Sequence, residues 1–189
     1  MNKNVGIDYS INSPALTIKD NNDFYFYCFA EKLPKTIPFK DGFITKKLEK
    51  NGNNIIDASL VAKDILKILQ NHNVINVNLE GYSYQSSSKA IFQIAENTGI
   101  LKYFLLQAGI KINIIQPSTV KQKAGGGGFK KFDMLQAFLK QENLKDNLFH
   151  QNCKKYENEL YKYNQDKTMI IGVKSPYSDI VDSYYLSVI

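Results

Sequence analysis

Four carboxylates are the residues of this sequence best placed to do chemistry. Asp8 ends the apolar run VGID, and Glu80 ends a second strand-like run, VINVNLE. Asp179 and Asp182 lie three positions apart near the end of the sequence. A buried, unpaired charge costs several kcal/mol, so acids that close apolar strands need a partner. If the two runs pair in one sheet, the acids meet at its edge. A divalent cation is then the natural partner, because such ions take oxygen ligands.

Each acid also has an ordinary explanation when it is considered alone. Asp8 fits a turn, and Glu80 fits a solvated strand end. Asp179 and Asp182 lie one turn apart on a predicted helix, and the pattern leaves open whether they face a sheet edge or water. The joint occurrence favours a site, because mutual repulsion raises the pKa values of clustered carboxylates when no cation is present.

Hydrophobic periodicity indicates the elements that position these acids. Three antiparallel strands followed by β-α-β crossovers predict an α/β fold, with a five-stranded mixed sheet flanked by helices in the ribonuclease H-like layout. The length of 189 residues favours a single domain over 1–189. The first half is predicted to hold three strands within 3–30, a polar loop near 31–55, a helix capped by Asp57 and the strand to Glu80. A helix from Ser88 to Ala108, a strand closed by Pro117 and a loop from Ser118 to Gly128 follow. The remainder is predicted to be a helix around Phe132, a polar insertion near 141–175 and a short terminal helix.

Composition is compatible with a polyanionic partner without being diagnostic of one. The net charge is +6, all basic residues other than histidine are lysine, and arginine is absent from the sequence. Without arginine, bidentate guanine reading is harder, so contacts to a nucleic acid would depend on phosphate charge and shape. Cys28 and Cys153 lie far apart without metal-ligand spacing, which predicts reduced packing residues and argues against zinc.

Localisation follows from what the sequence lacks. Its apolar stretches fall short of the roughly 18–20 residues that a membrane span needs. The start, MNKNVGIDYS, has no apolar leader, which predicts a protein that is not secreted. The abundance of Asn, Ile and Lys is typical of an AT-rich genome. We therefore expect the cytoplasm, or the DNA-containing compartment of an AT-rich host or virus.

Four segments in order resemble the RuvC-type Holliday junction resolvases. GIDYSINSPALTI is similar to the family's opening hairpin with its catalytic aspartate, and LEGYSYQSSSKAIFQIAENTGIL is similar to the region of its catalytic glutamate. QPSTVKQKAGGGGFKKFDM resembles the family's P-x-x-V-K stretch, glycine turn and helix start, and DIVDSYYLSV its terminal D-x-x-D helix. The family's Pro-Gly after the first aspartate is replaced by Tyr9-Ser10. The matched positions are Asp8, Glu80, Pro117, Val120, Lys121, Lys131, Met134, Asp179 and Asp182.

The resemblance implies hydrolysis of phosphodiester bonds by two Mg²⁺ or Mn²⁺ ions about 3.5–4 Å apart. Asp8 would bridge both ions, and Glu80, Asp179 and Asp182 would complete their ligands. The implied substrate is branched DNA, above all the four-way junction of recombination and repair. Paired symmetric nicks would leave 5′-phosphate and 3′-hydroxyl ends. Two symmetric cuts imply a homodimer. The helix from Ser88 to Ala108, with apolar residues on more than one side, is the expected interface.

Basic and aromatic residues near these motifs are candidate DNA contacts. Four consecutive glycines are flanked by lysines, and a backbone of this kind can approach a phosphate closely. Tyr82 and Tyr84 follow Glu80 and would stack on an unpaired base at the junction centre. A flexible surface loop and simple packing are the alternatives. The predicted DNA-binding residues are Lys121, Lys123, Gly126, Gly127, Lys130, Lys131, Tyr82 and Tyr84.

Three other functions remain to be separated from a strict resolvase. A broader structure-selective nuclease on flaps, forks and branched DNA would keep the chemistry and change the substrate. A non-catalytic DNA-binding module would keep the fold, although it would gain nothing from four acids that repel phosphate. An actin-like ATPase also carries Gly-Ile-Asp in a β-hairpin but needs a second, duplicated domain.

Overall fold

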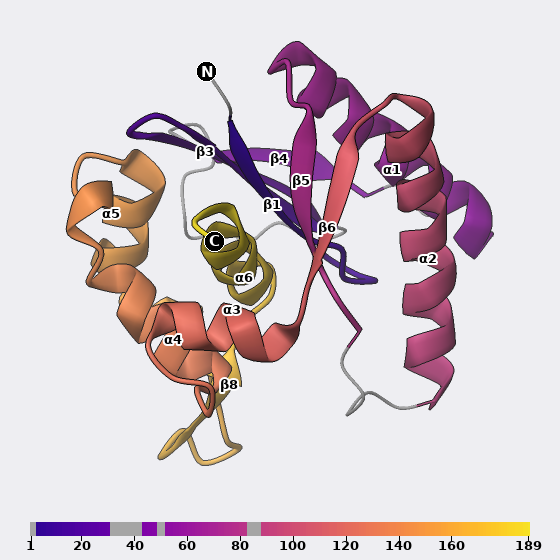
Figure 1. The fold of residues 1–189 in the computed structure, drawn as a ribbon. Helices are drawn as coiled ribbons and strands as arrows, with labels where there is room; N and C mark the ends of the chain where they lie inside the picture. Colours follow the sequence, from indigo (N-terminus) through magenta and orange to yellow (C-terminus); the bar gives the residue numbers. More distant parts are fainter. Residues whose placement is uncertain (1–2, 31–42, 49–51, 83–87) are drawn as a thin grey trace.

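The computed structural model, which describes residues 3–30, 43–48, 52–82 and 88–189, is built on a mixed sheet with helices on both faces (Figure 1). Strands β1, β2 and β3 pair antiparallel, β5 and β6 run parallel to β1, and β4 pairs parallel with β3. In sheet order the strands are β4 (Phe43–Lys47), β3 (Asp23–Ala30), β2 (Ala15–Asp20), β1 (Asn4–Asp8), β5 (Asn76–Glu80) and β6 (Lys111–Ile115).

Two helical layers cover the sheet (Figure 1). Helices α1 (Asn54–Asn71) and α2 (Ser88–Gln107) cover one face. The other face carries α6 (Tyr177–Ser187), which packs directly on β1 and β2. The remaining elements on this second side are α3 (Pro117–Ala124), α4 (Lys131–Leu139), α5 (Leu148–Lys155), the 3₁₀ turns Glu142–Leu144 and Glu157–Leu160, and the hairpin of β7 (Tyr161–Tyr163) and β8 (Ile170–Val173).

The predicted fold class is confirmed. Strands β3-β2-β1-β5-β6 form the five-stranded ribonuclease H-like arrangement, with β1, β5 and β6 parallel. The alternation predicted for β1 also holds, because Val5 and Ile7 are buried in the cluster beneath α1 and α2. Cys28 and Cys153 are buried free thiols, as predicted. None of the helices in the described part of the chain is long and apolar enough to cross a membrane.

Local predictions were wrong in the polar segments. The loop near 31–55 contains β4, whose sequence FITKK has little apolar pattern and which is held by backbone pairing at the edge of the sheet. Helix α1 begins earlier than predicted, since Asn53 rather than Asp57 accepts the N–H groups of Ile55 and Ile56. Side-chain oxygens of Asn and Asp serve equally as caps, so the pattern did not choose between them.

Two further segments hold regular structure that was not predicted. The expected loop from Ser118 to Gly128 is mostly α3, which Pro117 begins and Gly125, at φ 143°, ends. Proline at the first helical position and glycine after the last are strong boundary signals. The insertion near 141–175 contains α5 and the β7–β8 hairpin. Its few apolar residues, such as Phe149 and Leu160, anchor it in the core.

Gly6 permits the close approach of α6 to β1. A Cβ atom at this position would lie 2.5 Å from both Leu186 Cβ and Ser187 N, and still closer to the carbonyl oxygen of Ser183. All of these atoms belong to α6, which is buried along its whole length. The helix that carries Asp179 and Asp182 is therefore seated against the strand that carries Asp8 only because residue 6 has no side chain.

Replacing Gly6 with alanine is expected to lower the free energy of unfolding by about 3 kcal/mol, at the upper end of the range for overpacking. Urea denaturation followed by circular dichroism measures the change. Gly128→Ala is the matched control, because a Cβ there meets open space. We expect that control to stay within about 0.5 kcal/mol of wild type. Equal midpoints for the two variants would contradict this account of the packing.

Candidate active site

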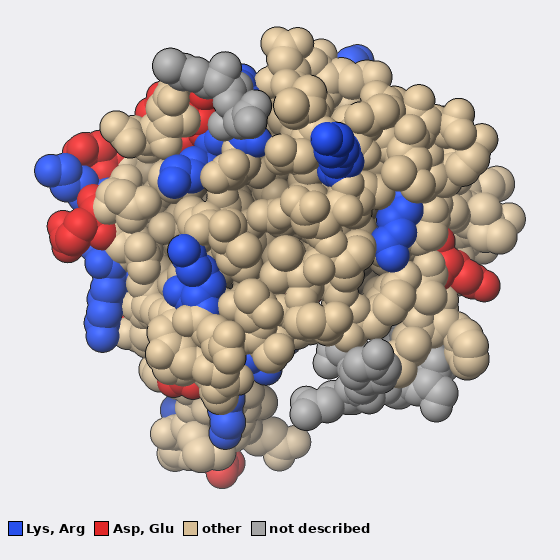
Figure 2. Space-filling model, in the orientation of Figure 1, with Lys and Arg blue, Asp and Glu red and all other residues tan. Residues whose placement is uncertain are grey.

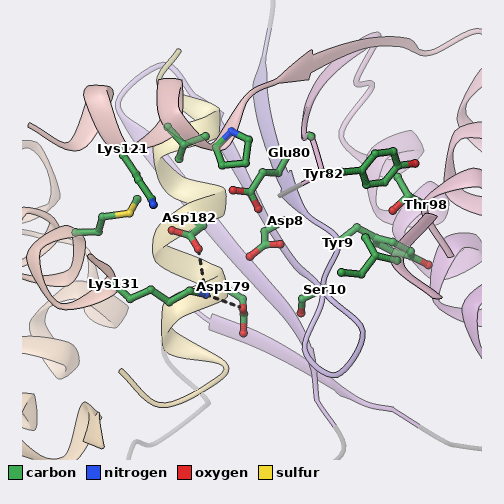
Figure 3. A pocket seen from close by; sticks show the side chains of 15 residues that line it. Asp8, Tyr9, Ser10, Glu80, Tyr82, Thr98, Lys121, Lys131, Asp179 and Asp182 are labelled. Carbon is green, nitrogen blue, oxygen red and sulfur yellow. Dashed lines mark ion pairs between the residues drawn. The ribbon is translucent and has the colours of Figure 1, made fainter. Parts of the chain in front are cut away.

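The four carboxylates predicted from the sequence line one pocket. Asp8 and Glu80 end the parallel neighbours β1 and β5, whose register pairs Ile7 with Leu79. Asp179 and Asp182 come from α6, which crosses beside these strands. Figure 3 shows the four side chains directed toward a common centre. The cavity that they line has a volume of about 350 Å³. Open α/β sheets form their ligand sites at such carboxyl ends of strands.

Burial makes this cluster electrostatically costly. Asp8, Asp179 and Asp182 are only 5–7% exposed. Burial, followed by repulsion from Glu80, Asp179 and Asp182, raises the pKa of Asp8 well above its usual range. Burial and the Asp182 charge raise the pKa of Glu80 to about 7. Burial is also the first cause that raises the pKa of Asp182, to about 6. The protein therefore holds acids that are hard to ionise together unless positive charge is added.

Lys131 supplies one positive charge within this cluster. Its Nζ atom lies 3.6 Å from Asp179 Oδ1 and 3.4 Å from Asp182 Oδ2 (Figure 3). Burial opposes the charged form of this lysine, but the surrounding carboxylates outweigh burial and raise the pKa of its ammonium. Lys121 also lines the cavity, so two lysines face four acidic side chains there. The position of Lys131 Nζ shows where a cation is stabilised.

The donor set fits a hard divalent cation. Carboxylate oxygens are the ligands that Mg²⁺ and Mn²⁺ prefer, and among the described residues no thiol or imidazole lines the cavity. Within the described residues, however, no three His, Cys, Asp or Glu side chains already stand in a metal-holding arrangement. Two of the four acids are instead paired with Lys131. A metal ion would have to draw these carboxylates together and replace part of that pairing.

The predicted DNA-binding residues divide into two groups. Lys121, Lys131 and Tyr82 line the same cavity as the acids. Tyr82 is 37% exposed, and Lys102 Nζ lies 5.1 Å from the centre of its ring. The residues that do not line it are Lys123, Lys130, Gly126 and Gly127, which lie on α3 and the glycine loop beside it. Tyr84 lies outside the described residues.

The glycine loop also has a packing role that the sequence did not indicate. A Cβ on Gly126 would lie 2.8 Å from the ring of Phe129, and a Cβ on Gly125 would lie 2.9 Å from it. The first two glycines therefore make room for this ring. Added side chains at Gly127 and Gly128 would meet no such conflict, since the nearest atom to a Cβ on Gly127 is 3.5 Å away and none lies within 4 Å of one on Gly128.

Sequence reasoning missed several polar residues around the acids. Ser10 and Thr98 line the cavity. Ser13 and Ser175 donate hydrogen bonds to Asp179. The only available signals were weak. Ser13 follows Asp8 by five positions, and Ser175 precedes Asp179 by four. Serines at such distances are common in loops, and only the packing of α6 on β1 and β2 brings these two to one carboxylate.

Comparison with known proteins identifies the fold and not a sequence family. No family model and no curated protein matches the sequence. Among solved structures, RuvC from Thermus thermophilus in complex with a Holliday junction substrate is 12% identical, with a TM-score of 0.54, over 84% of this chain and 96% of that chain. A second Thermus thermophilus RuvC structure is 15% identical, with a TM-score of 0.50, over 82% of this chain and 95% of that one.

A eukaryotic structure extends the likeness. The yeast mitochondrial Holliday junction resolvase Ydc2 is 11% identical, with a TM-score of 0.50, and the match covers 97% of this chain and 75% of that chain. The structure of this protein therefore matches RuvC and other Holliday junction resolvases in its ribonuclease H-like fold. At these identities the likeness concerns the arrangement of elements.

The raised pKa values predict how the stability of the metal-free protein depends on pH. Glu80 shifts from 4.5 to about 7 and Asp182 from 3.8 to about 6, so between pH 4 and 7 the folded state binds more protons than the unfolded state. Stability then falls as pH rises through this window, by about 1.4 kcal/mol for each unit of pKa shift that is passed. We expect the melting temperature in EDTA to drop by several degrees from pH 5 to pH 7.5.

Calorimetric melts at fixed ionic strength test this dependence. Glu80→Gln together with Asp182→Asn should flatten the profile, because neither amide titrates. Addition of Mg²⁺ at pH 7.5 should restore stability to the wild type and not to this double variant. A wild-type profile that rises between pH 5 and 7.5 in EDTA would contradict the electrostatic account.

Proposed function

We propose that this protein is a metal-dependent endodeoxyribonuclease that resolves four-way DNA junctions by paired symmetric nicks. The observation that carries this proposal is the convergence of Asp8, Glu80, Asp179 and Asp182 on one buried pocket at the carboxyl ends of β1 and β5. A binding module would gain nothing from this cluster, because buried carboxylates repel the phosphates of DNA. The shared fold with resolvases that bind Holliday junctions supports the choice of substrate.

The four acids would hold two Mg²⁺ or Mn²⁺ ions. When bound, such ions lower the pKa of the attacking water and stabilise the leaving 3′-oxygen, so that the products carry 5′-phosphate and 3′-hydroxyl ends. Asp8, at the centre of the cluster, would be one of the residues that hold these ions. Glu80 faces it from β5, while Asp179 and Asp182 close the other side from α6 (Figure 3). Lys131, which is paired with Asp179 and Asp182, would supply positive charge beside the phosphate.

Lysines around the pocket would guide the DNA backbone to the acids. Lys121 lines the cavity from α3, and Lys123 and Lys130 lie on the adjoining exposed surface. Figure 2 shows separate lysines scattered over the face in view, with acidic side chains toward its edges. The backbone of Gly126 and Gly127 would approach a phosphate beside these lysines. Tyr82, exposed at the rim of the pocket, would stack on a base left unpaired at the junction.

A homodimer would supply the second active site. One exposed stripe of α2 consists of residues spaced four and three positions apart, namely Phe92, Glu96, Gly99, Tyr103 and Leu106. Phe92, Tyr103 and Leu106 in this stripe are 61–71% exposed. Gly99 lies at its centre, where a Cβ would meet nothing within 4 Å. Apolar residues at this spacing pair helices, and a central glycine allows close approach.

Cleavage of a synthetic four-way junction in Mg²⁺, beside a matched linear duplex, tests the proposed activity. We expect the wild type to make paired nicks at symmetric positions of the junction alone. Asp8→Asn should lower the rate by at least about a thousandfold, because it removes a proposed metal ligand and one negative charge. Thermal melts check that the variant is folded, and Asp57→Asn on α1 is the control that should cleave like wild type.

The other outcomes of this experiment choose between the alternatives. Equal cutting of flaps and replication forks would make the protein a general nuclease for branched DNA. Tight junction binding with no cleavage in Mg²⁺ or Mn²⁺ would leave a binding module on the same fold. Either result would replace the strict resolvase with the corresponding class.

Leu106→Glu is expected to convert the dimer to a monomer, because it replaces one of the three apolar side chains of the α2 stripe and adds a second charge to Glu96. Light scattering coupled to gel filtration measures the mass. Ile171→Glu is a matched control, since Ile171 is 60% exposed but lies in β8, outside the stripe. The monomeric variant should nick junctions singly rather than in pairs. A monomeric wild type would overturn the dimer at this surface.

A further inference from the structure

The two oxygens of Asp179 have different kinds of partner. Oδ2 accepts hydrogen bonds from the hydroxyl groups of Ser13 and Ser175, each at 2.5 Å. Oδ1 lies 3.6 Å from the ammonium of Lys131. The two serine hydroxyls also contact each other. One oxygen is therefore occupied by neutral donors, while the other faces the position where positive charge is stabilised.

The two serines come from segments that are remote in the sequence. Ser13 is buried, 4% exposed, and lies in the turn between β1 and β2. Its backbone N–H donates to Ser10 Oγ at 3.2 Å, which braces the turn. Ser175 lies two positions before the start of α6. The contacts on Asp179 thus join the turn that follows Asp8 to the segment that leads into the helix of Asp179 and Asp182.

Ser175 does not serve as a cap for α6. The residue at the capping position is Pro176, and no side chain makes a capping hydrogen bond at this end of the helix. The hydroxyl of Ser175 instead donates a hydrogen bond to the carboxylate of Asp179, four positions later. Because Ser175 itself is exposed, it is not needed to fill the core. Among the described residues, the side-chain partners of the Ser175 hydroxyl are Asp179 and Ser13.

We propose that Ser13 and Ser175 form a hydroxyl clamp, a pair of positioning residues that hold Asp179 with Oδ1 directed at a divalent cation. This proposal rests on the metal-dependent function proposed above. Hydrogen bonds from hydroxyls to a carboxylate are short and directional, so two of them on one oxygen restrict rotation of the group. Neutral donors achieve this without adding a charge that would repel the cation, as a lysine or arginine at the same place would.

Ligand carboxylates depend on such partners for affinity. Loss of an outer hydrogen bond typically lowers metal affinity by about 10–100-fold. The clamp also sets how far Asp179 stands from Asp8, since Ser13 and Asp8 belong to the same hairpin. Ser10, two positions after Asp8, has a role in this arrangement, because its hydroxyl oxygen accepts the hydrogen bond that holds the backbone of Ser13.

Binding of Mn²⁺ to the full-length protein, followed by electron paramagnetic resonance of the free ion, tests the clamp without relying on catalysis. The double variant Ser13→Ala with Ser175→Ala is expected to bind Mn²⁺ at least about tenfold more weakly. Junction cleavage by this variant should need correspondingly more Mn²⁺ and recover at saturation, while its affinity for the junction in Ca²⁺ stays unchanged. Ser187→Ala is the matched control, since this buried hydroxyl of α6 donates to the backbone oxygen of Tyr184.

Each outcome bears on a distinct claim. Unchanged Mn²⁺ affinity in a folded double variant, with Asp8→Asn weakening binding in parallel, would overturn the clamp and leave the nuclease standing. Failure of the wild type to bind Mn²⁺ would overturn the proposed function and the clamp together. If the double variant does not fold, the single variants Ser175→Ala and Ser175→Thr are compared for Mn²⁺ affinity. Weaker Mn²⁺ binding by Ser175→Ala, with wild-type binding by Ser175→Thr, supports the clamp. Equal Mn²⁺ affinities of the two variants overturn it.

Discussion

The crowding of four acidic side chains, three of them buried, between one sheet edge and one helix is the constraint on which this structure depends. Asp8 and Glu80 lie close together, because the parallel pairing of β1 and β5 brings the carboxyl ends of the two strands side by side. Helix α6 adds Asp179 and Asp182 to the same space. Lys131, the first residue of α4, offsets part of the repulsion. This arrangement lowers the stability of the protein, and the divalent cations proposed above would offset that cost.

The core holds these charges together. Helix α6 is buried along its whole length, and the rings of Tyr184 and Phe138 pack at 5.1 Å between it and α4. Gly6 lets the helix approach β1 closely enough for its acids to reach the strand end. The site is thus carried by a rigid sandwich of sheet, α6 and α4 rather than by loops. Rigid elements of this kind place ligand groups more accurately than loops do.

The surroundings of the acids separate into charged and neutral partners with different consequences. Lys121 and Lys131 neutralise charge and would meet phosphate. Ser13 and Ser175 add direction without charge. This chain shares the fold of the resolvase structures at only 11–15% sequence identity, so most side chains can differ while the fold is kept. The partners of the acids in this chain therefore have to be taken from its own contacts. Ser13 and Ser175, for example, reach Asp179 from segments that no short sequence motif connects.

The strongly periodic segments were predictable, whereas the polar ones were not. Strands β1 and β5 alternate apolar and polar residues, and helices α1 and α2 have apolar residues at a period of about 3.6, because each buries one face. These patterns can be recognised in the sequence alone. Strand β4, helix α3 and the strands of the β7–β8 hairpin are each eight residues or shorter, too short to show a clear period, so they depend on partners that the local pattern does not contain. The candidate acids were visible for the same reason, since each interrupts or follows an apolar pattern.

The sequence by itself determined the fold class, the order of the core elements and the identity of the four acids, because hydrophobic period and strand ends are local properties of the chain. Only the tertiary structure decided that Asp179 and Asp182 face inward, that Lys131 lies between them, and that two distant serines hold Asp179. These outcomes depend on how closely α6 approaches β1 and on which turns meet across the sheet, and such long-range packing leaves no periodic signal in the sequence.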